Sequence, residues 1–228
     1  MKKPMKVDEM SNREIKAALA AAAWLDEEIM RADQKKATIE ITKEDLAKRS
    51  IGWNSYFYWK DFQPGLDVAY YYNGGGDEIA ILLEDDRVLI TGFDHESNIS
   101  PHGRDDGYYM WPGMLEGAPA DLVKILLEEP IGKPEFPDES IPWPIRTLVT
   151  DDCVTFALWR ETSSDPFMPS KTISYPKSED GGRGWLFNDR AFTADRFWKY
   201  CQEEYSDDVA MTEERVHEVY AICSELFE

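Results

Sequence analysis

The chain has 228 residues, of which 43% are hydrophobic and 13% aromatic, so it has enough apolar material for a folded core. It carries 45 Asp and Glu residues against 25 Lys and Arg residues, a formal net charge of −20 at pH 7. This charge repels phosphate backbones and anionic membrane surfaces, so we expect the chain to bind neither nucleic acid nor membranes directly.

The location of the protein is predicted from its apolar runs and its cysteines. No apolar run approaches the roughly 20 residues that a membrane helix needs, and Ala17–Leu25 lacks the features of a signal peptide. The three cysteines, Cys153, Cys201 and Cys223, are odd in number and widely spaced, which favours buried thiols over disulfides or a zinc site. We therefore expect a cytoplasmic protein.

The first fifty residues read as a helical segment. Ser11-Asn12-Arg13-Glu14 is a capping box, and apolar residues then recur at helical spacing from Ile15 to Ile29. A short strand is predicted over 37–41, and Thr42 can cap a short helix over 44–49. We expect residues 1–50 to form an N-terminal helical segment and residues 51–228 to form an α+β core domain.

The middle of the chain predicts an antiparallel sheet. An aromatic-rich stretch over 53–62 is followed by predicted strands over 66–72, 78–84 and 87–93. The glycines at 74–76 and the pair Asp85-Asp86 provide short turns between them. Strands joined by such short turns form a meander, because parallel strands would need crossover helices.

The remaining elements are predicted to complete an α+β fold. A helix is expected over 119–129, and a strand over 153–160 is expected to pair with a strand over 171–175. Thr193 can cap a helix that runs through Tyr205, and Thr212 can cap a last helix. We expect these C-terminal helices to pack on the antiparallel sheet.

One loop collects residue types that can carry chemistry. It includes Asp94, His95, Glu96 and Ser97, and then His102 and Asp105-Asp106. A metal site would use His95, His102 and one or more of the acids Asp94, Glu96, Asp105 and Asp106. A hydrolase would use Ser97 as nucleophile and one of the two histidines as base. The simpler interpretation, which we prefer, is that Asp94 and Ser97 cap a turn and His95 bonds to nearby acids.

The acidic charge is concentrated in one part of the chain. Residues 77–139 hold 16 acidic and 4 basic side chains. Such a surface can steer a basic protein towards it, although acidic residues also simply promote solubility. The predicted contact residues are the acids Asp85, Asp86, Asp105 and Asp106 and the aromatic residues Tyr108, Tyr109 and Trp111, which are either anchors for a partner or pins for the loop.

Several segments together resemble a family of small bacterial proteins to which no function is assigned. The segments are Gly92-Phe93-Asp94-His95-Glu96-Ser97, Trp111-Pro112-Gly113, Leu127-Glu128-Glu129-Pro130 and Thr155-Phe156-Ala157-Leu158-Trp159-Arg160. The resemblance covers most of the chain after residue 51, and it implies no activity. In size and acidity the chain is also similar, more generally, to immunity proteins that neutralise bacterial toxins.

The leading functional prediction is an acidic cytoplasmic binding protein, with an inhibitor or a toxin-immunity protein as its most specific form. The alternative is a metal-dependent or hydrolytic enzyme centred on the loop from Asp94 to Asp106. We expect no cofactor and no transition metal bound tightly enough to remain through purification. The number of chains in the assembly is not predicted.

Overall fold

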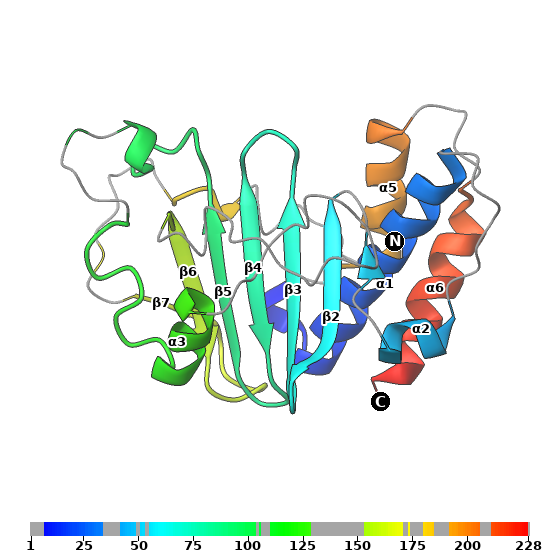
Figure 1. Ribbon diagram of the computed structural model, residues 1–228, viewed down its shortest axis with the longest axis horizontal. Helices are drawn as coiled ribbons and strands as arrows, with labels where there is room; N and C mark the ends of the chain where they lie inside the picture. Colours follow the sequence, from blue (N-terminus) through cyan, green and yellow to red (C-terminus); the bar gives the residue numbers. More distant parts are fainter. Residues whose placement is uncertain are drawn as a thin grey trace. The chain divides into compact units, whose positions relative to one another are not determined.

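The architecture is an α+β fold built on one antiparallel sheet, as predicted. The computed structural model describes residues 7–33, 42–48, 51–52, 55–103, 105, 110–128, 153–170, 173, 180–184, 192–205 and 211–227. Its seven strands follow one another in the order β1-β2-β3-β4-β5-β6-β7 (Figure 1). By its contacts the chain divides into two compact units, Met1–Ala69 with Asp189–Glu228, and Tyr70–Asn188. The division at residue 50 stays a prediction.

The first unit opens with the helix that the capping box predicts. After a short 3-10 helix, Val7–Glu9, helix α1 spans Asn12–Asp33. Ser11 Oγ accepts a bond from the amide of Glu14, and Glu14 Oε2 accepts one from the amide of Ser11 at 2.6 Å. Thr42 and Asp45 form the same reciprocal pair at the start of α2, Lys43–Lys48. The predicted strand over 37–41 lies outside the described residues.

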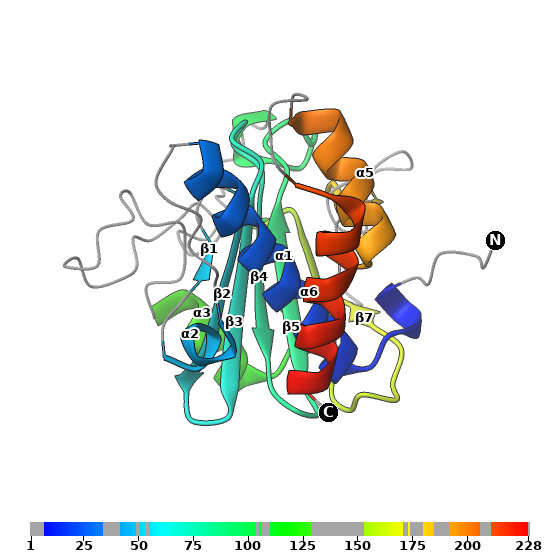
Figure 2. The same cartoon turned by 90° about the vertical axis from the view of Figure 1, so that its right-hand side faces the viewer.

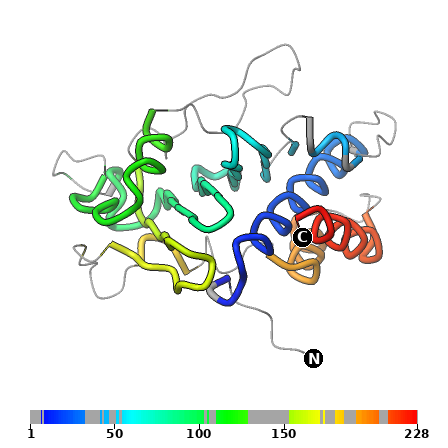
Figure 3. The backbone as a smooth tube through the Cα atoms, turned by 90° about the horizontal axis from the view of Figure 1, so that it is seen from below, coloured from blue at the N-terminus to red at the C-terminus, as the bar shows by residue number. Residues whose placement is uncertain are grey.

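Helices from both ends of the chain pack together in this unit. Strand β1 spans Ile51–Gly52 and β2 spans Tyr56–Gln63; helices α5 and α6 span Ala194–Glu204 and Glu213–Leu226. Helix α1 packs against α6, β1 and β2, and Figures 2 and 3 show α1 and α6 side by side. The alanines at 20–23 are fully buried, and their small side chains allow this close approach. The side chains of Thr193 and Thr212 cap α5 and α6 as predicted.

Strands β4, β5 and β6 form the centre of the second unit. Strand β3 (Leu66–Tyr72) precedes β4 (Glu78–Leu83), β5 (Val88–Phe93), β6 (Phe156–Arg160) and β7 (Met168–Pro169). Every residue of β4, β5 and β6 is buried, so both faces of these strands are covered. Glu78 lies opposite Phe93, and Gly92 lies opposite Phe156.

The strand that pairs with β6 comes earlier in the chain than predicted. Met168–Pro169 pairs with Leu158 and Trp159, whereas the expected strand covered 171–175. The backbone carbonyl of Thr162 accepts a bond from the amide of Asp165, which closes a tight turn between β6 and β7. Phe167 then packs under the guanidinium of Arg160, 4.6 Å from the ring centroid. Residues 171, 172, 174 and 175 lie outside the described residues.

Helix α3, Ala120–Glu128, joins the second unit through an apolar face and one ion pair. Leu122 and Leu126 are buried, and Asp121 on the first turn binds Arg87, the residue before β5. A short 3-10 helix, Pro101–Gly103, lies in the loop after β5. All three cysteines are buried free thiols, as expected. No helix in the described part of the chain is long and apolar enough to cross a membrane.

Candidate functional site

The candidate site is built where β5 ends and β6 begins. Thr155 immediately precedes β6, and its Oγ1 accepts a hydrogen bond of 2.9 Å from the amide of Asp94. The same hydroxyl donates to the carbonyl of Gly181 at 2.6 Å. The amide of Thr155 also donates to the carbonyl of Gly92. One buried threonine therefore joins the end of β5 to a distant turn and fixes the backbone of Asp94.

A pair of glycines lets that turn approach Asp94 closely. Gly181 and Gly182 have φ angles of +70° and +87°, in the region that favours glycine. A Cβ at Gly182 would lie 2.5 Å from the Cβ of Asp94. The side chain of Asp180 shapes the turn by accepting bonds from the amides of Gly182 and Gly184.

The segment after β5 is a series of capped turns, as the preferred interpretation predicted. Asp94 Oδ1 accepts a bond from the amide of Glu96 at 3.0 Å, and Ser97 Oγ accepts one from the amide of Ile99 at 3.4 Å. Ser97 is buried, 5% exposed. This cap role and this burial do not favour Ser97 as a nucleophile, which needs a hydroxyl that a substrate can reach.

His95 is paired with an acid that the sequence analysis did not select. Its Nδ1 lies 2.7 Å from Oδ1 of Asp77, and its backbone amide donates to the same oxygen at 2.9 Å. The Asp77 side chain is 3% exposed, whereas that of His95 is 38% exposed. The other ring nitrogen, Nε2, is 3.9 Å from Oε1 of Glu96, whose side chain is 83% exposed. A buried carboxylate thus orients an imidazole that remains accessible.

The β3–β4 hairpin holds Asp77 in place. Asn73 Oδ1 accepts bonds from the amides of Gly75 and Asp77, and Asn73 Nδ2 donates to Asp77 Oδ2. The predicted glycine turn is therefore confirmed, and it has a second role. Gly76 lies against the His95 ring, where an added Cβ would be 3.7 Å from the ring atoms.

The hydrogen bond that the His95 ring donates to the Asp77 carboxylate, together with the nearby negative charge, raises the pKa of His95 above its ordinary value of about 6.5. We expect Asp77→Asn to lower this pKa, because the neutral amide no longer favours the charged imidazole. A nuclear magnetic resonance titration of the histidine ring protons, with chelator present, measures the change, and His217 in α6 is the internal reference. An unchanged pKa of His95 in Asp77→Asn would contradict the pairing.

The same pairing predicts how stability depends on pH. Because folding raises the pKa of His95, the pair stabilises the fold fully below the unfolded pKa of about 6.5, and this stabilisation is lost as the pH rises through the folded pKa. The difference in unfolding free energy between the wild type and His95→Gln should therefore shrink with rising pH over that window.

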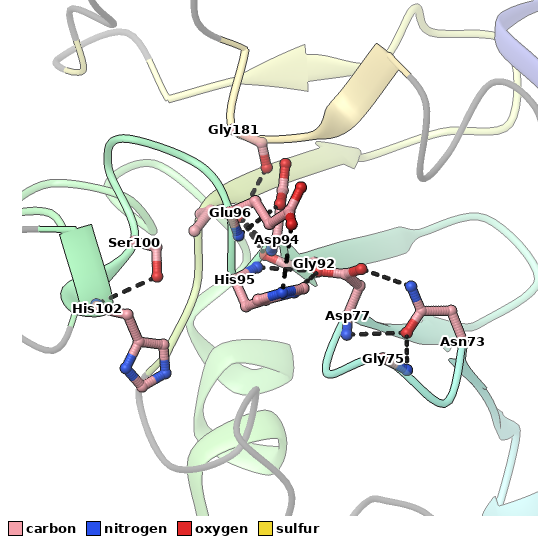
Figure 4. Close-up of polar contacts among 11 residues, drawn as sticks. Asn73, Gly75, Asp77, Gly92, Asp94, His95, Glu96, Ser100, His102 and Gly181 are labelled. Carbon is pink, nitrogen blue, oxygen red and sulfur yellow. Dashed lines mark hydrogen bonds and ion pairs between the residues drawn. The ribbon is translucent and has the colours of Figure 1, made fainter.

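His102 lies apart from the His95–Asp77 pair, although the metal hypothesis combined the two histidines. The ring of His102 is exposed and makes an edge contact with Phe93, at 5.8 Å between ring centroids. Its backbone amide donates to Ser100 Oγ, and Figure 4 shows its ring turned away from the pair. Among the described residues, the possible ligands that come together are Asp77, Asp94 and His95.

The predicted partner-binding residues occupy two separate places. Asp85 and Asp86 are exposed in the turn between β4 and β5, and Asp105 is exposed in the loop that follows β5. These two places lie at opposite ends of β5, a six-residue strand of roughly 20 Å. Trp111 is half-buried. Asp106, Tyr108 and Tyr109 lie outside the described residues.

The site residues that the sequence analysis missed were Asn73, Asp77, Thr155 and Gly182. The signal for Asp77 was present in the hairpin. Glu78 pairs with Phe93 in the β4–β5 ladder. Asp77, which precedes Glu78, must therefore lie beside Asp94, which follows Phe93. Thr155 and Gly182 had no comparable signal, because nothing local in the sequence relates them to Asp94.

The chain matches no family model, no curated protein and no solved structure among those with which it was compared. The resemblance to a bacterial family and the general similarity to toxin-immunity proteins therefore stay predictions.

Proposed function

We propose that the chain is a cytoplasmic binding protein that recognises a basic protein partner. Its most specific form is an inhibitor or immunity protein that neutralises a toxin. The net charge of −20 supports a basic partner, and the observation that carries the proposal is the charge arrangement at the turn between β4 and β5. We call this surface the acidic turn, which consists of Glu84, Asp85, Asp86 and Asp121 with Arg87.

The one cation of the acidic turn is already held by acids of the same surface. Arg87 Nε donates to Glu84 at 2.6 Å, and its two terminal nitrogens donate to Asp121 at 2.9 and 2.6 Å. These bonds lower the pKa of Asp121, which keeps it ionised. Asp85 and Asp86 are exposed in the same turn between β4 and β5. The acidic turn therefore contains four carboxylates and one guanidinium, and it keeps a net negative charge.

Such a surface affects association more than it affects the lifetime of a complex. Several exposed negative charges together attract a positively charged partner over a Debye length of about 8 Å at physiological salt. They raise the rate of encounter, while buried apolar contacts determine how long the complex lasts. The acidic turn is thus suited to steering, and the exposed acids Glu203 and Glu204 of α5 give a matched comparison.

The proposal is tested by affinity capture from the native cytosol with three forms of the tagged protein. The first is the wild type; the second is Asp85→Asn with Asp86→Asn; the third is Glu203→Gln with Glu204→Gln, on helix α5. Both variants remove two exposed charges. We expect the wild type and the third form to capture the same basic protein at low salt, and the second form to capture much less of it.

Two outcomes would contradict this proposal. An acidic partner, held equally by all three forms, would remove the electrostatic argument. Equal losses in the two variants would show that total charge matters and that the acidic turn has no special part. Circular dichroism and a melting curve of each variant confirm that it is folded before the comparison is made.

The alternative function is a metal-dependent or hydrolytic enzyme centred on the segment after β5. The observation that favours it is the buried Asp77 carboxylate, which orients His95 while the His95 side chain stays 38% exposed. An accessible, oriented imidazole is the arrangement that general bases use. Acid–base chemistry at this place would need a nucleophile or a metal ion beside the pair.

A further inference from the structure

We propose that Asp77, Asp94 and His95 form a binding site for one divalent transition-metal ion. The inference is independent of the proposed partner binding. One ligand atom from each of the three side chains lies within 4.8 Å of the others. The sequence-based metal hypothesis had instead joined His95 to His102 and did not include Asp77.

The donor set defines the class of ion. Two carboxylate oxygens and one imidazole nitrogen suit Zn²⁺, Mn²⁺ or Fe²⁺, whereas Ca²⁺ and Mg²⁺ prefer oxygen ligands alone. Ligand atoms bound at about 2.1 Å to a tetrahedral ion stand about 3.4 Å apart, so small side-chain movements would close the site. Three protein ligands leave at least one coordination position for water, so the ion can exchange with solvent.

Burial distinguishes these two acids from the exposed carboxylates elsewhere on the chain. Asp77 and Asp94 are 2% and 6% exposed, so both have lost most of their contact with water. Two close, poorly solvated carboxylates are costly unless positive charge offsets them. A divalent ion held between the two carboxylates would offset the charge of both. Its 38% exposed ring leaves a route from solvent to the site.

The ligands are held by partners from outside the set, as metal ligands usually are. Asn73 orients Asp77 from the hairpin, and the amide of Glu96 binds Asp94 Oδ1. Thr155 fixes the backbone of Asp94, and Gly182 packs against its side chain. These supports come from the β3–β4 hairpin, the end of β5, the start of β6 and the turn at 180–184. These supports therefore hold the three side chains close to the positions that a bound ion would require.

Calorimetric titration with Zn²⁺ in excess Mg²⁺ tests the site, because Mg²⁺ occupies the non-specific acidic surface. The purified chain is first treated with chelator. We expect one equivalent to bind to the wild type, to His102→Gln and to Asp85→Asn with Asp86→Asn. His95→Gln should weaken the affinity by more than about 100-fold, since loss of a supporting residue alone costs about 10–100-fold. Equal binding by the wild type and a folded His95→Gln would overturn the proposal.

A second measurement uses the wild type and so does not depend on how a variant folds. Mn²⁺ is paramagnetic and broadens the resonances of nuclei close to it. At a tenth of an equivalent, in excess Mg²⁺, the ring signals of His95 should broaden first, while those of His217 remain sharp. Uniform broadening of both rings, or none at all, would show that the three side chains hold no specific ion.

Discussion

Replacing Gly182 by Ala should lower the free energy of unfolding by about 3 kcal/mol or more. A left-handed backbone costs a non-glycine residue about 1–2 kcal/mol, and overpacking a filled site costs about 1–3 kcal/mol more. Both apply here, because Gly182 has a φ of +87° and a Cβ there would meet Asp94 at 2.5 Å. Urea denaturation followed by fluorescence measures the loss.

Gly74→Ala is the matched control for this change. Its φ of +80° is similar, but nothing lies within 4 Å of the position of an added Cβ. Only the backbone term applies, so the expected loss is about 1 kcal/mol. Equal losses at Gly182 and Gly74 would mean that the turn at 180–184 does not press against Asp94, and the support of the metal site would lose one of its four segments.

Asp67→Ala should lower the free energy of unfolding by about 3–5 kcal/mol, at least as much as Gly182→Ala, because it breaks a buried charge pair. Lys16 and Asp67 are 5% and 4% exposed, and Lys16 Nζ lies 3.6 Å from Asp67 Oδ2. The same carboxylate accepts bonds from the hydroxyl of Tyr58 and the amide of Asp61. The substitution therefore removes an acceptor from three donors, one of them a buried ammonium group.

Glu203→Ala is the control for the Asp67 prediction. Glu203 pairs with Lys199 at 3.2 Å on the surface of α5, and both side chains are more than half exposed. Exposed pairs of this kind contribute about 0.3–0.5 kcal/mol. Chemical denaturation of both variants gives the comparison. A loss below about 1 kcal/mol for Asp67→Ala would show that water or another group compensates Lys16.

Local signals in the sequence predicted most of the fold. The residues that cap the helices, Ser11, Thr193 and Thr212, act within one turn of their own positions, so a short window of sequence contains the whole interaction. The same holds for the turns at 74–76 and 85–86, which made the meander predictable. The partner strand of β6 was predicted over 171–175, whereas the described residues place β7 at Met168–Pro169.

The candidate site was only half predictable because its contacts join distant parts of the sequence. The loop after β5 was selected correctly as a place where His95 meets acids. The acid that orients His95 lies 18 residues earlier, and the threonine that fixes Asp94 lies 61 residues later. The first relation follows from hairpin register, whereas the second depends on how β6 enters the sheet, which no local pattern specifies.

The most direct test of the proposed function is the association rate with the captured partner, measured by stopped flow at several salt concentrations. The Debye length falls from about 10 Å at 0.1 M to about 3 Å at 1 M salt. We predict that the rate falls steeply over this range for the wild type and less steeply for Asp85→Asn with Asp86→Asn, while the dissociation rate changes little. An association rate that does not depend on salt, or that is the same for both forms, would contradict binding steered by the acidic turn.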